Sequence, residues 1–284
     1  MLLAVFIYWG WDTTVSVNEE TEDSTETPGR AAIVSVFVLV FTYVIVTVAA
    51  ISFGGPDALA NDQSGDVLGL EANAVFGSSL LGKLVVIAVL SSAAASCQTT
   101  ILPTARTALS MARAKALPAK LGEVNPQYMT PAFATWLMGI VSVVWYVGLT
   151  ILSENMLFDA IAALGLMIAF YYGLTGYACA IYYRRELFKS VRNFLFIGFA
   201  PVVGALMLTG IFVKSCIDLA DPANSASGSA WFGLGPPLVI GLGFLVMGVV
   251  LMIFWRVAGH PEFFGRRPEV ADPALVARSP AGRA

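Results

Sequence analysis

The sequence predicts an all-α integral membrane protein with seven transmembrane segments, the first of which is broken. Of its 284 residues, 57% are hydrophobic and only 12% are charged, whereas a soluble domain has about 25% charged residues. Its long apolar runs lack two-residue alternation, so they predict helices that contact a lipid bilayer and not barrel strands. The formal net charge of -3 excludes a basic surface for nucleic acid, and no nucleic acid partner is expected.

Six of the apolar runs are long enough to cross a membrane, which takes about 20 residues. They span residues 31–53, 80–103, 133–152, 158–183, 194–216 and 236–255. A polar loop at 54–78 is expected outside the membrane, with a short surface helix at 71–76. The tail from residue 258 is rich in Pro, Arg and Ala and is expected to be disordered.

The remaining segment, residues 1–17, has a polar interruption. It is apolar up to Trp9, and Gly10-Trp11-Asp12 then brings a glycine and an acid into the segment. An acid at mid-membrane costs about 2.5–3.5 kcal/mol on insertion scales, and glycine weakens a helix. Backbone groups freed by a break are tolerated only beside protein or a wet cavity. We therefore expect an unwound stretch at 10–12 that faces a cavity.

The Lys and Arg residues predict the orientation of the chain. All of them except Lys83 and Lys214 fall on one side of the membrane, and the positive-inside rule places that side in the cytoplasm. We expect a multi-pass protein of the cell (plasma) membrane with its N-terminus outside and its C-terminus in the cytoplasm. An outside N-terminus without a basic signal-peptide region predicts that an upstream part is absent.

Two motifs resemble those of the amino acid/polyamine/organocation (APC) permeases. The first, similar to the family's sixth helix, is Tyr8-Trp9-Gly10-Trp11-Asp12 followed by Asn18-Glu19-Glu20 and Pro28-Gly29-Arg30. The second, which resembles the loop after the family's eighth helix, runs from Ala105-Arg106-Thr107 to Thr130-Pro131. Ala114-Lys115 departs from the family, which commonly has an acidic residue and a glycine there. The resemblance covers residues 1 to about 257.

The resemblance implies the second half of a five-plus-five inverted-repeat transporter fold plus two extra helices. Residues 1–183 would form the second repeat, 184–257 the additional helices and 258–284 the cytoplasmic tail. The implied function is secondary active transport of amino acids or related organic cations, by a truncated C-terminal portion that lacks the first repeat. The alternative is a non-transporting fragment, or a half-transporter that assembles with a separate N-terminal half.

The expected substrate site lies at the break, because substrates of such folds bind beside broken helices near the midplane. By the resemblance, carbonyls at Phe6 and Trp9 receive the amino group of the substrate, and Phe6 covers it. The expected substrate-binding residues are Phe6, Trp9, Gly10, Trp11, Asp12 and Thr13. The alternative is that these aromatic side chains serve packing or the membrane interface.

Asp12 has two competing interpretations. It could carry a proton and link proton movement to substrate movement, because no other acid lies well inside an apolar run. It could instead cap a second half-helix at Thr13 and Thr14.

A second candidate group is formed by Ser92, Ser96 and Thr99, which have the i, i+4, i+7 spacing of one helix face. Pro103 leaves the Thr99 carbonyl without an intrahelical donor. In sodium-coupled relatives of this fold, hydroxyls on this helix bind sodium. Small hydroxyl residues also let membrane helices pack closely. The coupling ion, H+ or Na+, therefore stays open.

Other chemistry is disfavoured. The single His260 lies in the polar tail and the three cysteines form no CxxC pair, so neither a metal site nor a cofactor is expected. The spans lack a nucleophile–base set, which argues against an enzyme. Without a G-x-x-x-x-G-K-[ST] motif, energy is expected from an ion gradient. Glu19, Glu20 and Arg30 predict either an inner gate of ion pairs or a solvated acidic loop.

Overall fold

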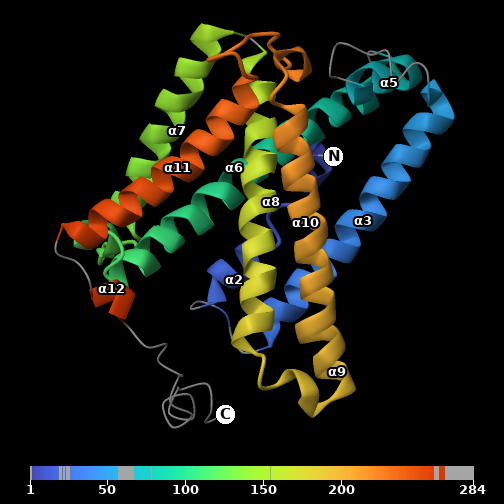
Figure 1. Cartoon of the computed structure of the whole chain (residues 1–284). Helices are drawn as coiled ribbons and strands as arrows, with labels where there is room; N and C mark the ends of the chain where they lie inside the picture. Colours follow the sequence, from blue (N-terminus) through green and yellow to red (C-terminus); the bar gives the residue numbers. More distant parts are fainter. Residues whose placement is uncertain are drawn as a thin grey trace. The chain divides into compact units, whose positions relative to one another are not determined.

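The computed structural model describes residues 2–18, 21, 23, 26–56, 67–77, 79–153, 155–258 and 262–265, and this part of the chain is helical without a sheet (Figure 1). The helices are α1 (Leu2–Ile7), α2 (Thr13–Ser16), α3 (Thr27–Gly54), α5 (Val67–Phe76), α6 (Leu80–Arg113), α7 (Ala132–Leu152), α8 (Met156–Tyr182), α9 (Val191–Asn193), α10 (Ala200–Asp218), α11 (Pro236–Val257) and α12 (Glu262–Gly265). A π-helical turn at Phe194–Phe199 joins α9 to α10.

Within the described residues, six helical runs are long and apolar enough to cross a membrane. They are α3, α6, α7, α8, α11 and the continuous run Val191–Asp218 that ends in α10. Each coincides with one of the six predicted apolar runs, which confirms the all-α integral membrane fold. The first segment is not among them because it is divided into α1 and α2. The short helix expected at 71–76 is α5, which begins at Val67.

Helix α6 extends further than the sequence predicted. Its apolar run ends at Pro103, but the helix continues to Arg113, so the part expected to begin a loop at Ala105 is helical. Pro103 removes one intrahelical hydrogen bond, yet the residues after it are mostly Ala, Arg, Leu and Met, which favour helices. The resulting helix has 34 residues.

The chain forms two compact units. Unit one contains residues 1–9 and 139–266, and unit two contains residues 10–138 and 267–284. The sequence-based division at residue 183 separates the expected second repeat from the two additional helices, and it stays a prediction.

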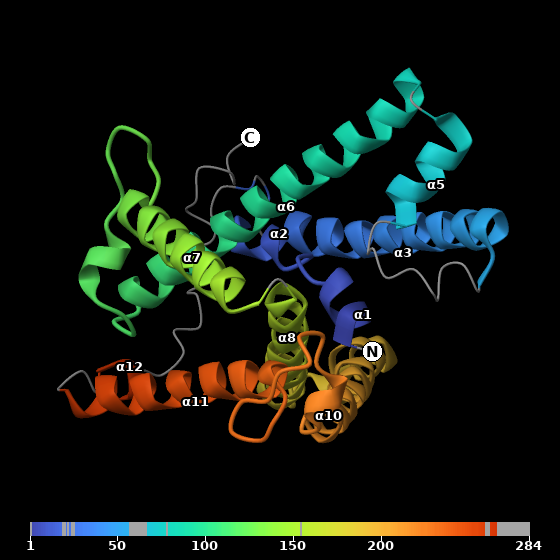
Figure 2. The same ribbon diagram turned by 90° about the horizontal axis from the view of Figure 1, so that it is seen from above.

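In unit one, α8 packs against α1, α10 and α11 (Figure 2). Met156, Leu166 and Ile168 on α8 are almost completely buried. A Cβ atom on Gly165 would lie only 2.8 Å from the Leu2 carbonyl oxygen. The missing side chain therefore lets the backbone of α1 lie directly on α8.

In unit two, the second part of α6 forms the core with the segment that follows it. Ala105, Ala108 and Ala112 pack against Leu121 and Ala134. Helix α2 contacts both α3 and α6, and α5 lies beside one end of each of α3 and α6 (Figure 2).

The apolar side chains of α3 are mostly exposed within unit two. The exposed fractions of Phe37 and Phe41 are 71% and 69%, as in a helix surrounded by lipid or by further protein.

Candidate functional site

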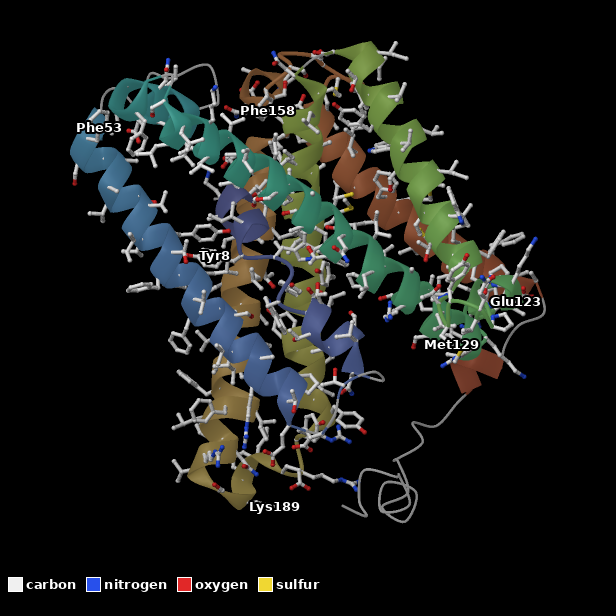
Figure 3. All side chains as sticks on the ribbon, turned by 180° about the vertical axis from the view of Figure 1, so that it is seen from behind. Tyr8, Phe53, Glu123, Met129, Phe158 and Lys189 are labelled. Carbon is white, nitrogen blue, oxygen red and sulfur yellow. The ribbon has the colours of Figure 1, made fainter. Side chains whose placement is uncertain are left out.

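The first segment is interrupted where the sequence predicted. Helix α1 ends at Ile7 and α2 begins at Thr13, with turns between them; Tyr8 marks this stretch in Figure 3. Gly10 has φ +108°, a conformation that side-chain-bearing residues rarely adopt. The boundary between the two units also falls here, between Trp9 and Gly10. The residue types therefore explain the break: glycine supplies the conformation that ends the helix.

On the unit-one side of the break, Phe6 and Trp9 lie together. Their ring centroids are 6.3 Å apart at an interplanar angle of 35°, and the Trp9 amide donates to the Phe6 carbonyl at 3.0 Å. The Trp9 indole Nε1 donates to the hydroxyl oxygen of Tyr171 on α8 at 2.6 Å. This bond fixes the ring of a predicted site residue against the most buried helix of its unit.

Tyr171 contacts a candidate site residue, Trp9, and the sequence did not predict this contact. Its ring contacts that of Tyr172 edge-on, with centroids 4.5 Å apart at 68°. Two successive tyrosines in the middle of an apolar run bring hydroxyl groups that need partners inside a membrane. This pair of tyrosines within an apolar run is the sequence feature that could have indicated Tyr171.

On the unit-two side, Asp12 occupies the N-cap position of α2. Its backbone is helical, and within the described residues its side chain makes no capping hydrogen bond to α2. The Asp12 carbonyl accepts from the Val15 and Ser16 amides at 3.0 and 3.1 Å. Asp12 therefore contributes its backbone to the start of α2, and its carboxylate is not used as a cap.

Threonine hydroxyls attach α2 to its neighbours in unit two. Thr13 Oγ1 donates to the Thr99 carbonyl on α6 at 3.3 Å, the carbonyl that Pro103 leaves without an intrahelical donor. Thr14 Oγ1 lies 3.2 Å from the Pro28 carbonyl at the start of α3. The hydroxyl of Thr13, which follows the break, therefore gives a hydrogen-bond donor to the Thr99 carbonyl that Pro103 leaves without one.

The structure brings only one member of the Ser92, Ser96 and Thr99 group to the interrupted segment. Thr99 is engaged through its carbonyl, as above, while its hydroxyl lies 3.0 Å from the Ala95 carbonyl and 3.2 Å from the Ser96 carbonyl. Ser92 and Ser96 are exposed within their unit. Their role in lining a cavity or binding an ion stays a prediction.

Asp159 is a buried acid that the sequence reasoning overlooked. It lies in the first turn of α8 and its exposed fraction is 1%. Its two carboxylate oxygens accept from the amides of Ala226 and Ser227, at 2.7 and 3.3 Å. It therefore fastens the α10–α11 connection to α8. Its position at the end of an apolar run made it look like a boundary residue.

The expected inner gate is tested only in part. Arg30 pairs with Glu26 at 2.5 Å, four residues earlier, and both side chains are mostly exposed. Glu19 and Glu20 lie outside the described residues. Arg30 thus stabilises the start of α3 through a local ion pair.

These features define a class. The apolar helices of membrane-crossing length are those of a multi-pass membrane protein, and a helix interrupted at a glycine is a feature of the folds of secondary transporters. The sequence profile of the family described as amino acid permease matches residues 1–242. The chain belongs to this family.

Curated relatives agree with this assignment. A protein of Mycobacterium bovis and proteins of two Mycobacterium tuberculosis strains, each described as an uncharacterized transporter, are 32% identical to this chain over 139 residues. The match covers 49% of this chain and 31% of each relative, so the chain spans only part of their length. No solved structure gives a significant match.

Proposed function

We propose that the chain is the C-terminal portion of a secondary active transporter for amino acids or related organic cations, with the substrate bound at the break in its first helix. The observation that carries this proposal is the interruption at Gly10 in a member of the amino acid permease family. An interrupted helix offers backbone carbonyls at the end of its first half, which suit the ammonium group of an amino acid.

The local geometry supports Phe6 and Trp9 as the residues that hold the amine end of the substrate. The carbonyl of Phe6 belongs to the last turn of α1, where the helix dipole favours a cation. The Trp9 ring is held by Tyr171 at 2.6 Å, so it offers a fixed aromatic surface beside these carbonyls. Gly10, Trp11, Asp12 and Thr13 follow directly along the chain and complete the proposed substrate-binding stretch.

Asp12 is the proposed coupling residue, with H+ or Na+ as the coupled ion. It lies in the interrupted stretch, and its side chain is not used to cap α2. Ser92, Ser96 and Thr99 are proposed as further cavity-lining or ion-coupling residues. The energy comes from an ion gradient, and neither an organic cofactor nor an enzymatic reaction is part of the proposal.

The first test is uptake of radiolabelled amino acids by proteoliposomes. The chain is reconstituted alone, and also together with the first-repeat segment of one of the mycobacterial relatives. We expect uptake only from the combined protein, because this chain spans part of its relatives. Uptake by the 284-residue chain alone would show that it needs no other half. If neither preparation transports any amino acid or amine, the substrate proposal fails.

The second test concerns Asp12. In the transporting preparation, Asp12→Asn should abolish uptake driven by a pH gradient and leave the protein folded. A sodium gradient is applied in parallel to identify the ion. If the variant keeps the parent's dependence of uptake on pH and on sodium, the coupling role of Asp12 is wrong.

The alternative is a half-transporter that assembles with a separately encoded N-terminal half. The match covers 31% of each relative, which fits this alternative as well as the fused form. Co-purification of such a partner with this chain, together with uptake by the pair, would support the alternative over the fused form.

A further inference from the structure

The short connection between α8 and α9 presents an exposed aromatic side chain. Phe188 is 85% exposed, whereas its neighbour Leu187 packs against Gly198, where a Cβ atom would come within 3.0 Å of the Leu187 side chain. The Phe188 ring lies beside that of Phe194, with the ring centroids 6.2 Å apart. A large apolar side chain is therefore held outside the packing of unit one.

Local hydrogen bonds fix the course of this connection. The Glu186 carbonyl accepts from Asn193 Nδ2 at 3.2 Å, and Ser190 Oγ accepts from the Arg192 amide at 3.1 Å, which caps α9. Lys189, which is labelled in Figure 3, pairs with the Glu186 carboxylate at 2.6 Å. The connection therefore presents its exposed side chains from a defined turn.

The same connection is strongly basic. Arg184, Arg185 and Arg192 are exposed, and none of the three forms an ion pair within the part of the chain that the structure describes. Glu186 is the only acid between residues 183 and 194, and Lys189 already pairs with it. Among the described residues, three guanidinium charges therefore have no acidic partner, which suits contact with a negatively charged surface.

The lengths of the flanking helices place this connection at the level of lipid headgroups. Helix α8 has 27 residues and the run Val191–Asp218 has 28, so at 1.5 Å per residue they are about 40 and 42 Å long. The hydrocarbon core is about 30 Å thick, and the bilayer with its headgroups about 40–45 Å. Helices of this length reach from one headgroup layer to the other. The residues that join them therefore lie among headgroups, on the side that the positive-inside rule places in the cytoplasm.

We propose that residues 184–192 form a docking surface for anionic phospholipids of the cytoplasmic leaflet. The three arginines bind phosphate groups, and Phe188 inserts between the headgroups, a layer that water also enters. Guanidinium groups match phosphate oxygens in a bidentate manner, and basic segments next to membrane helices are attracted to anionic lipids. An apolar side chain gains free energy when it is buried at the boundary between headgroups and acyl chains. The proposal concerns contact with lipid and does not rest on the transport function.

The test measures lipid binding to the purified chain in a neutral detergent, by native mass spectrometry and by the midpoint of thermal unfolding. The probes are phosphatidylglycerol, phosphatidylcholine and inorganic phosphate. We expect phosphatidylglycerol to bind more tightly and to raise the midpoint more than either of the others. If phosphatidylcholine does as well, the arginine charges do not govern the contact and the proposal fails. It fails equally if inorganic phosphate reproduces the stabilisation, because the ligand is then a soluble anion.

A double variant tests the arginine charges. Arg184→Gln/Arg185→Gln should weaken phosphatidylglycerol binding about thirtyfold, since each basic residue near an anionic surface contributes about fivefold. The control is Lys83→Gln/Lys214→Gln, which removes the same charge from the two residues expected on the opposite side of the membrane and should keep the affinity of the parent. Equal losses in the two double variants would reveal a general charge effect and contradict the proposal.

A second variant tests the aromatic contribution and guards against misfolding of the arginine variant. Phe188→Ser keeps every charge and, because the side chain is 85% exposed, should leave the fold intact. We expect it to weaken phosphatidylglycerol binding at least threefold. Helical content by circular dichroism shows whether each variant is folded. Undiminished binding by the folded Phe188→Ser variant would contradict insertion of the ring, and with it the proposed docking surface.

Discussion

Gly10 is the residue on which the interrupted helix depends most directly. Among the described residues, a Cβ atom at this position would meet nothing within 4 Å. Space is therefore not the reason for glycine. The reason is φ +108°, which a side chain makes unfavourable.

The first prediction follows from that backbone angle. Gly10→Ala should lower the free energy of unfolding by about 1–3 kcal/mol, the usual cost of a strained backbone conformation, measured as a lower thermal midpoint in detergent. Gly210→Ala in α10 is the control, because it also meets nothing within 4 Å but has no positive φ. That variant should be neutral or slightly stabilising. Equal behaviour of the two variants would contradict the interrupted geometry.

Asp159 gives the second prediction at the residue scale. Asp159→Asn keeps the size of the side chain but turns one end into a donor that faces a backbone N–H, so a buried donor loses its acceptor. We expect a loss of about 1–3 kcal/mol in unfolding free energy and faster hydrogen exchange at Ala226 and Ser227. Asp221→Asn, an exposed carboxylate that accepts from the Ala223 amide, should have a smaller effect. A larger loss of unfolding free energy in Asp221→Asn than in Asp159→Asn would show that the two hydrogen bonds of the buried Asp159 carboxylate do not stabilise the fold.

At the scale of elements, α8 organises unit one through its small residues. Gly165 admits the backbone of α1, and Gly176 brings the Pro201 carbonyl of α10 within 2.8 Å of where a Cβ would be. These contacts leave no space for a methyl group. The placement of α1, and with it the Trp9–Tyr171 bond, therefore depends on a glycine in another helix.

The third prediction tests this dependence. Gly165→Ala should push α1 away from α8, with a destabilisation of about 1–3 kcal/mol typical of overpacking and faster hydrogen exchange in α1. Gly173→Ala on the same helix is the control, because its Cβ would lie 3.7 Å from its nearest neighbours, an ordinary contact. If α1 exchanges equally in both variants, its attachment to α8 is not governed by Gly165.

The elements were predictable from the sequence to the extent that single segments determine them. Six apolar runs and the glycine–acid interruption were found because length and composition alone mark them. The helical course of 105–113 was missed because a proline and charged residues resemble the start of a loop. Tyr171 and the contacts of Asp159 were missed because their partners, Trp9 and the 226–227 amides, are far away in the sequence.

At the scale of the whole molecule, the distribution of Lys and Arg predicts on which side of the membrane each connection lies. The segment after α8 contains Arg184, Arg185, Lys189 and Arg192, while the connection between α10 and α11 contains one acid, Asp221, and no Lys or Arg. The positive-inside rule places the first of these connections in the cytoplasm and the second outside.

The fourth prediction follows from this placement. In a variant without the three native cysteines, Ala223→Cys should react with a membrane-impermeant maleimide in intact cells. Phe188→Cys, whose parent side chain is 85% exposed, should react only after permeabilisation. The opposite labelling pattern would reverse the orientation.

The bond between Asp159 and the α10–α11 connection has a consequence for how this protein can diverge. The carboxylate holds main-chain amides and not the side chains of Ala226 and Ser227. Most residues except proline can therefore replace Ala226 without loss of this contact, whereas Ser227 also accepts from the Ser229 amide through its hydroxyl at 3.3 Å. Substitutions at the exposed position 226 could therefore alter the surface of this connection without changing its path, as long as Asp159 is retained.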